Sequence, residues 1–243
     1  MSIKHISPHD DQEQKDVDRE INILKKLTHT YCVRFVAAYS TKKKNNYIVT
    51  DFCNQGTLEQ LLKRRKTLTE AEALTVIRQI AEVMNCLKDE GLDNKDQEGV
   101  LLMHRDIKPA SILLHDGECR VADFGLSKLV DKKYEGKNLK HTRCGTLAYM
   151  PPEALDDKGY SEKCDIWAAG VVLYQMLFGR TPSVEKLADG IVDELFRDSR
   201  PVKDEVKGLL GAMLEVEEKK RISWKGILDH PAIKSVGPNV KIE

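Results

Sequence analysis

The run from Ile166 to Phe178, IWAAGVVLYQMLF, constrains the fold more than any other stretch of this chain. It contains no charged residue, and its apolar side chains cover nearly every face of a helix. A helix that is apolar all round has to be surrounded by protein. The run is also too short to span a bilayer, which takes about 20 residues. We therefore expect a helix at the centre of a mainly helical lobe.

The first part of the chain, up to residue 53, is rich in strand patterns. SIKHI stands at its start, and VRFVAAY and NYIVTDF follow, joined by a turn of lysines and asparagines. After a polar stretch that runs to Asp18, a helix is expected with Ile21, Leu24 and Leu27 on its apolar face. Residues 1–53 therefore predict a small β-rich lobe.

From residue 54 the helical period dominates. Thr69 and Glu72 form a plausible capping box ahead of a long apolar stripe, and Val206–Leu214 carries another. A short hairpin is expected around Asp116-Gly117, and the polar stretch 93–99 is expected to be an exposed loop. The fold class is thus α+β in two lobes, with residues 54–243 forming the larger, mainly α-helical one.

Composition narrows the class of protein. Lysine plus arginine number 39 and aspartate plus glutamate also 39, so net charge offers no reason to bind nucleic acid or an anionic membrane. The cysteines form neither a C-x-x-C pair nor a cluster with histidine, which is typical of reduced thiols. The N-terminus lacks the apolar run of a signal peptide. We expect a cytoplasmic protein, with the nucleus as the alternative location, and no nucleic-acid or membrane partner.

Several short motifs occur in a fixed order. HRDIKP covers residues 104–109, DFG covers 123–125, PPE covers 151–153, and DIWAAGVVLY begins at Asp165. One such tripeptide is common by chance, but the ordered set is not. The set resembles the signature of eukaryotic-type protein kinase domains of the serine/threonine class. That resemblance implies a two-lobed kinase fold, ATP as the phosphoryl donor and a protein substrate.

The resemblance assigns catalysis to particular side chains. Asp106 would accept or orient the proton of the acceptor hydroxyl, Lys108 would reach the transferring phosphate, and Thr146 would hydrogen-bond the aspartate. Asp123 would offer a hard carboxylate oxygen to Mg²⁺, with Mn²⁺ as the alternative ion.

Two ion pairs are implied as well. Glu20 resembles the helix glutamate that pairs with a strand lysine, and Lys4 is its candidate partner; otherwise Lys4 is an ordinary surface lysine. Arg221 stands where the family has an arginine that pairs with Glu153.

The adenine side of the nucleotide pocket would come from the end of the small lobe. Thr50 matches the residue at the back of the pocket, and Asp51 to Cys53 match the hinge whose backbone would contact adenine. Leu113 would form the floor. Purely structural roles fit these positions equally well.

One threonine is a candidate for regulation. Thr142 stands two residues before Cys144, at a position where many relatives are phosphorylated. A phosphate there would add roughly two negative charges that Arg105 could bind, which would order the segment. The alternative is an unmodified loop threonine.

Two departures from the family pattern bear on activity. Ser111 stands where the family has an asparagine whose amide oxygen ligates a second Mg²⁺; a serine hydroxyl is also a neutral oxygen ligand, but a shorter one. No G-x-G-x-x-G occurs anywhere in the sequence, so the resemblance suggests an N-terminally truncated small lobe. Such a lobe would expose a sheet edge and an apolar face, so either a protein partner or self-association covers them or the sequence starts late in the domain.

Three functions compete on the sequence alone. The first is an active serine/threonine protein kinase, and the second is a catalytically impaired pseudokinase that acts as a scaffold or regulatory binding module. The third, a small-molecule phosphotransferase, is disfavoured by Thr146 and the PPE segment, which are features of kinases that act on proteins. Retention of Asp106, Lys108 and Asp123 favours the first.

Overall fold

The computed structural model of this chain describes residues 1–42, 45–89, 100–131, 146–155, 161–183, 201–237 and 240–243. Thr142 and the expected loop at 93–99 lie outside these residues. The strands are β1 (Ser2–Ile6), β2 (Phe35–Ser40), β3 (Asn46–Thr50), β4 (Val100–Met103), β5 (Ile112–His115), β6 (Glu118–Val121) and β7 (Lys128–Asp131). The α-helices are α1 (Asp11–Lys26), α2 (Leu58–Arg65), α3 (Glu70–Asp89), α4 (Pro152–Leu155), α5 (Lys163–Phe178), α7 (Asp204–Met213), α8 (Trp224–Asp229) and α9 (Pro231–Lys234).

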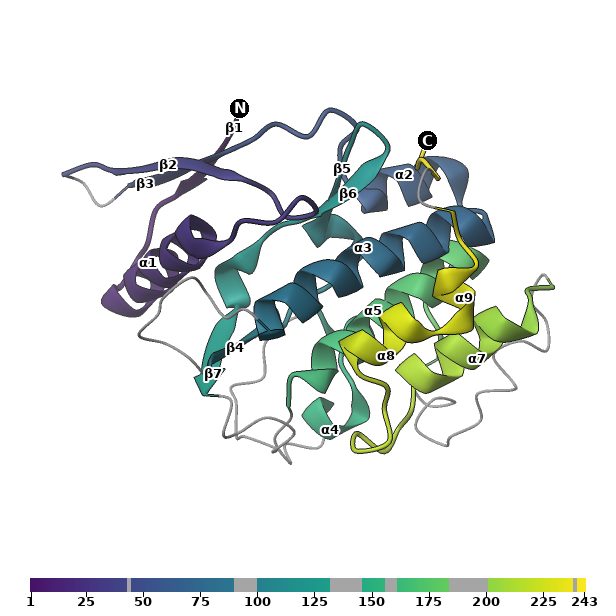
Figure 1. The fold of residues 1–243 in the computed structure, drawn as a ribbon. Coiled ribbons are helices and arrows are strands. Elements are labelled where there is room, and N and C mark those ends of the chain that lie inside the picture. Colours follow the sequence, from purple (N-terminus) through teal and green to yellow (C-terminus); the bar gives the residue numbers. More distant parts are fainter. Residues whose placement is uncertain (43–44, 90–99, 132–145, 156–160, 184–200, 238–239) are drawn as a thin grey trace.

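The small lobe is an antiparallel sheet in the order β1-β3-β2, with α1 beside it (Figure 1). Helix α1 begins earlier than the sequence pattern predicted, because Asp10 caps it by accepting the Glu13 N–H at 2.7 Å. The polar residues that were assigned to a stretch before the helix lie within it, while Val17, Ile21 and other apolar residues are buried. The β-rich small lobe and its helix are otherwise as predicted.

The apolar side chains Ile3, Val36 and Tyr39 of this sheet are exposed. They are compatible with the expected partner or self-association, which stays a prediction. The expected division of the chain after Cys53 also stays a prediction; that position falls in the segment between β3 and α2.

The large lobe is built around α5, as its sequence predicted. Every residue of α5 from Cys164 to Tyr174 is buried, and α3 and α7 pack against it (Figure 1). The capping box at the start of α3 is confirmed: Thr69 Oγ1 accepts the Glu72 N–H at 3.2 Å, and the Glu72 carboxylate accepts the Thr69 N–H at 2.9 Å. The predicted hairpin is formed by β5 and β6. None of the helices in the described part of the chain is long and apolar enough to cross a membrane.

Arg221 binds helix α4 to the rest of the large lobe. Its Nη1 and Nη2 atoms donate to the two Glu153 carboxylate oxygens at 2.7 and 3.0 Å, which confirms the predicted pair. The guanidinium also lies 5.1 Å from the centre of the Trp167 ring and donates to the Glu215 carbonyl at 2.9 Å. The Arg221 side chain is fully buried, so these partners have to offset the cost of removing its charge from water.

We predict that Glu153→Ala lowers the free energy of unfolding by about 3 kcal/mol, because a buried guanidinium loses its counter-charge. Urea denaturation followed by tryptophan fluorescence measures this loss. The matched control is Glu59→Ala, which breaks the exposed Glu59–Lys63 pair and should cost less than about 1 kcal/mol. Equal losses in the two variants would contradict the prediction.

Candidate active site

The loop from His104 to Ser111, here called the HRD loop, connects β4 to β5 and is hydrogen-bonded to the start of α5. The Asp165 carboxylate accepts the backbone N–H of His104 at 2.7 Å and that of Arg105 at 2.8 Å. Burial raises the pKa of Asp165, although His104 and these two N–H groups favour its charged form. Arg105 has a positive φ of 65°, a strained conformation that the two contacts hold in place.

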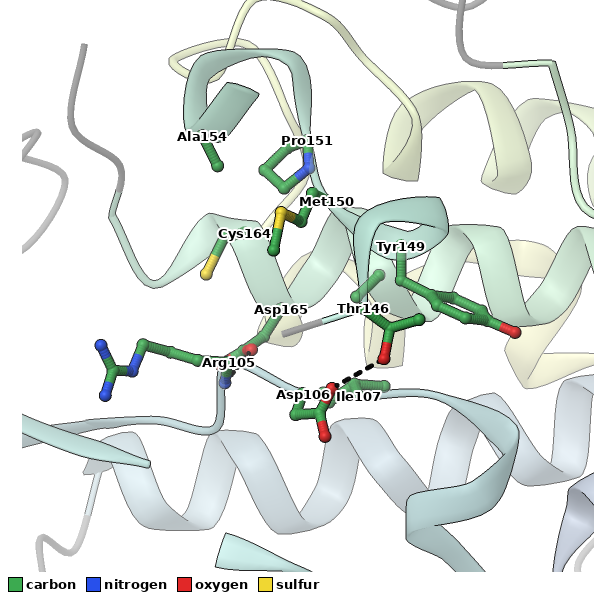
Figure 2. A pocket seen from close by; sticks show the side chains of 11 residues that line it. Arg105, Asp106, Ile107, Thr146, Tyr149, Met150, Pro151, Ala154, Cys164 and Asp165 are labelled. Atoms are coloured by element: carbon green, nitrogen blue, oxygen red, sulfur yellow. Dashed lines mark hydrogen bonds between the residues drawn. The ribbon is translucent and has the colours of Figure 1, made fainter. Parts of the chain in front are cut away.

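Three polar side chains of the predicted site lie close together, two from the middle of the HRD loop and one from residue 146. Lys108 Nζ is 2.7 Å from Asp106 Oδ2 and donates to Thr146 Oγ1 at 3.1 Å. The Thr146 hydroxyl donates to Asp106 Oδ1 at 3.3 Å (Figure 2). Asp106 is only 8% exposed, so the ammonium and the hydroxyl act on it in a largely desolvated place. The contact between Thr146 and Asp106 that the resemblance implied is present.

A small hollow of about 30 Å³ lies beside Asp106 (Figure 2). Its walls are mostly apolar and come from the HRD loop, residues 146–154 and the start of α5: Ile107, Met150, Pro151, Ala154, Cys164 and Ala168. None of the residues that were expected to contact the nucleotide lines it. The hollow is therefore distinct from the nucleotide pocket that the sequence predicted.

Lys4 on β1 joins the small lobe to the DFG turn. Its Nζ donates to both Glu20 carboxylate oxygens at 2.8 and 3.0 Å and to Asp123 Oδ1 at 3.1 Å. Burial alone would lower the pKa of Lys4, but Glu20 and Asp123 together outweigh it and raise that pKa. A Cβ on Gly125 would lie 3.2 Å from Glu20 Oε2, so the glycine lets the carboxylate approach closely. The structure thus forms the predicted Lys4–Glu20 pair and brings Asp123 to it.

The expected hinge follows β3 and lies against the β5–β6 hairpin. Asp51 is bound through its side chain to Arg34, at 2.7 and 3.0 Å, and its N–H donates to the Arg34 carbonyl. Cys53 is half-buried, which raises the pKa of its thiol. Leu113 is partly buried and pairs with Thr57 through a β-bridge, which brings it next to the segment that follows the hinge.

Ser111 does not sit in the site as a free oxygen ligand. It is 1% exposed, and its hydroxyl lies 2.9 Å from the carbonyl oxygens of Asp106 and Lys108, to which its single proton donates. The same oxygen accepts the Lys108 N–H at 3.1 Å. The hydroxyl is therefore used to hold the HRD loop, and the interpretation of Ser111 as a metal ligand does not fit this geometry.

Sequence reasoning missed two contributors to the site. Asp165 was noted only as the start of the buried helix, although an ionisable residue at the head of an all-apolar run is itself a signal. Arg34, the partner of Asp51, carried no signal in the sequence. Arg105, expected to bind a phosphate on Thr142, donates from Nε to the Leu126 carbonyl at 2.6 Å.

We predict that Ser111→Ala lowers the free energy of unfolding by about 1–3 kcal/mol, because the buried N–H of Lys108 loses its acceptor. Chemical denaturation measures the effect. Ser235→Ala is the matched control: its hydroxyl donates to one helix carbonyl at an exposed position, and its loss should cost about 0.5 kcal/mol or less. A Ser111→Ala protein as stable as the control would contradict the assigned role.

The comparisons with known proteins agree with this geometry. A family model described as "Protein kinase domain" matches residues 1–233. The chain is similar to the serine/threonine-protein kinase atg1 of Dictyostelium discoideum, with 30% identity over 226 residues that cover 89% of this chain and 32% of the relative. It is also similar to serine/threonine-protein kinase 33 of Bos taurus, with 32% identity over 234 residues, 89% of this chain and 46% of the relative.

An Aurora kinase of Schizosaccharomyces pombe is 31% identical over 226 residues, 90% of this chain and 59% of the relative. The chain thus spans less than two thirds of the length of these relatives. The family model, in contrast, covers nearly the whole chain and includes every site residue described above. The chain belongs to the protein kinase family.

Proposed function

We propose that this chain is an active serine/threonine protein kinase, which transfers the γ-phosphoryl group of ATP to a serine or threonine hydroxyl of a protein. The observation that carries the proposal is the cluster of Asp106, Lys108 and Thr146. Placing a carboxylate and an ammonium together in a nearly buried place contributes little to stability. Phosphotransfer, however, needs both charges at one point.

The roles follow from the charges. Asp106 would accept a hydrogen bond from the acceptor hydroxyl and so turn its lone pair toward the γ-phosphorus. A new oxygen–phosphorus bond then forms while the bond from the γ-phosphorus to the β,γ-bridging oxygen breaks, and ADP leaves with the electron pair. The hydroxyl proton passes to Asp106, and the Lys108 ammonium stabilises the charge on the transferring group. Lys4 would hold the remaining phosphates.

The residues present fit one divalent cation better than two. Asp123 has a half-exposed carboxylate beside Lys4, and it would hold Mg²⁺ or Mn²⁺, which neutralises phosphate charge when bound. Ser111 does not fit a second ion, because its hydroxyl is buried and already bonded within the HRD loop. Among the described residues no three His, Cys, Asp or Glu side chains gather as a ready-made metal site. This suits an ion bound largely through phosphates.

The surroundings of Asp106 support a protein rather than a small molecule as the acceptor. The small hollow beside Asp106 is mostly apolar, and Leu147, which follows Thr146 in the chain, is 66% exposed. We propose that residues flanking the acceptor serine or threonine of a protein would lie on this apolar surface. Phosphorylation of Thr142 and its binding by Arg105 belong to the same proposal.

The second candidate is a pseudokinase that binds a partner without transferring phosphate. One observation favours it: the Ser111 hydroxyl is bonded within the HRD loop. The two functions differ in a single measurable property, phosphate transfer.

The test is transfer of labelled γ-phosphate from ATP to a mixed serine/threonine peptide substrate and to the chain itself, in Mg²⁺ and separately in Mn²⁺. We expect transfer by the unaltered chain and a loss of at least about a hundredfold in Asp106→Asn, which removes the charged acceptor. Asp204→Asn, an exposed change of the same kind on α7, is the control and should transfer normally. Absence of transfer in both metals, with ATP still bound, would favour the pseudokinase.

We further predict that Ser111→Asn raises the transfer rate by about tenfold or more, by the scale that single charge-stabilising groups contribute to catalysis. An asparagine amide can donate to the Asp106 carbonyl and still present its oxygen to a second cation. Titration with free Mg²⁺ should therefore show a second activating phase in the variant. An unchanged rate with a single phase would mean that the oxygen at this position does not limit the reaction.

A further inference from the structure

The last residues of the chain, Val240 to Glu243, here called the C-terminal strap, lie against the β5–β6 hairpin and α2 (Figure 1). Ile242 is 0% exposed and belongs to the main hydrophobic core. Its N–H donates to the Gly117 carbonyl at 3.0 Å. Ordering an end segment costs conformational entropy, so full burial of one of its residues requires specific contacts. Those contacts lie on elements that frame the expected nucleotide pocket.

Gln55 links the strap to the hairpin. Its Nε2 donates to the Ile242 carbonyl at 3.4 Å, and its Oε1 accepts the Gly117 N–H at 2.7 Å. The Gln55 backbone is bound as well, because its N–H donates to the Leu114 carbonyl at 3.0 Å, while the Leu114 N–H donates to the Gly56 carbonyl at 2.8 Å. One residue just past the hinge therefore contacts the strap, the hairpin turn and β5.

The neighbouring residues extend this connection toward the pocket. Asn54, next to Cys53 of the hinge, donates from Nδ2 to Asp116 Oδ1 at 2.7 Å and accepts the Asp116 N–H at 3.2 Å. Leu113, the expected pocket floor, is bridged to Thr57. The residues after the hinge are thus bound to the β5–β6 hairpin, which also contains Leu113. The strap is bound to the turn of the same hairpin.

The strap passes so close to the hairpin turn that a side chain at Gly117 would clash with it. Gly117 has a φ of +76°, and a Cβ there would lie 2.7 Å from Cδ and 2.9 Å from Cβ of Lys241. Lys241 Nζ is 3.3 Å from Glu118 Oε1, and Arg65 at the end of α2 donates to the Glu243 carbonyl. The strap is therefore held on both sides of Ile242.

We infer that Ile242 is a positioning residue for the nucleotide: its buried side chain anchors the strap, whose backbone bonds to Gly117 and Gln55 fix the hinge and Leu113 in the arrangement that binds adenine. The inference rests on the proposed function for its ligand, ATP. The backbone of Ile242 bonds to Gln55, which follows the hinge, and to Gly117 of the hairpin that carries Leu113, so we expect the strap to act on nucleotide affinity rather than on the transfer step at Asp106.

The test compares Ile242→Ala with Ile233→Ala in the full chain. Ile233 is an equally buried isoleucine on α9, so both variants lose the same methyl groups from the core. Hydrogen exchange of the Gln55 and Leu114 amides reports on the hinge and on β5, and titration calorimetry with ATP measures the dissociation constant. Because apparent affinity falls with the fraction of competent molecules, a hinge that is competent in about one fifth of them weakens ATP binding about fivefold.

We expect Ile242→Ala to accelerate exchange at both amides and to raise the dissociation constant and the KM for ATP about fivefold, with kcat at saturating ATP retained. Ile233→Ala should lose comparable stability without either change. If Ile242→Ala does not fold, Ile242→Val and Ile233→Val form a milder matched pair with the same expected directions.

Equal exchange at Gln55 and Leu114 in the two variants, or equal ATP affinity, would overturn the inference and make Ile242 an ordinary core residue. Failure of the proposed function is a separate result: the unaltered chain would then transfer no phosphate. In that case faster exchange in Ile242→Ala alone would still support the strap as the element that positions the hinge, and unchanged exchange would overturn it.

Discussion

The buried carboxylate of Asp165 is the contact on which the site depends. It stands at the start of α5, the helix that is surrounded by protein, and it accepts the N–H groups of His104 and Arg105. Burial disfavours its charge, as the direction of its pKa shift indicates, and the two N–H bonds offset part of that cost. The HRD loop is therefore bound to the start of a helix that is buried along most of its length. Asp106 directly follows Arg105, so these bonds also fix its position. In this way a loop can hold catalytic side chains in a precise arrangement.

Lys4 makes the complementary connection from the small lobe. Its three N–H donors are divided between Glu20, whose side chain is 5% exposed, and Asp123, which is half-exposed. The bonds to Glu20 hold α1 against β1, whereas the bond to Asp123 lies open to solvent and is weakened by screening. An incoming phosphate would therefore compete for the Lys4 ammonium at the Asp123 side first. The pairing that orients α1 would persist while the lysine turns toward the nucleotide.

Sequence patterns predicted the elements whose residue pattern extends over many positions, and the contacts that polar and charged side chains make. The α5 core followed from its composition, the Thr69–Glu72 cap from residue types that bond locally, and the Lys4–Glu20 pair from the kinase resemblance. The start of α1 was misplaced, because one cap at Asp10 outweighs the polar sequence that follows it. The strap was not predicted at all. A single isoleucine forms no repeating hydrophobic pattern in the sequence, and only the tertiary contacts of Ile242 show where it is buried.

The role of Ser111 follows from counting donors and acceptors. An asparagine amide has two N–H donors and a carbonyl oxygen, so it can hold a loop and ligate a cation at once. A serine hydroxyl has one proton and two lone pairs. In this chain the proton serves the carbonyls of Asp106 and Lys108, and one lone pair accepts the Lys108 N–H. What remains is a single lone pair on an atom with almost no exposure. The serine therefore keeps the loop geometry, and the cluster around Asp106 is intact, while the one lone pair left on Ser111 is buried.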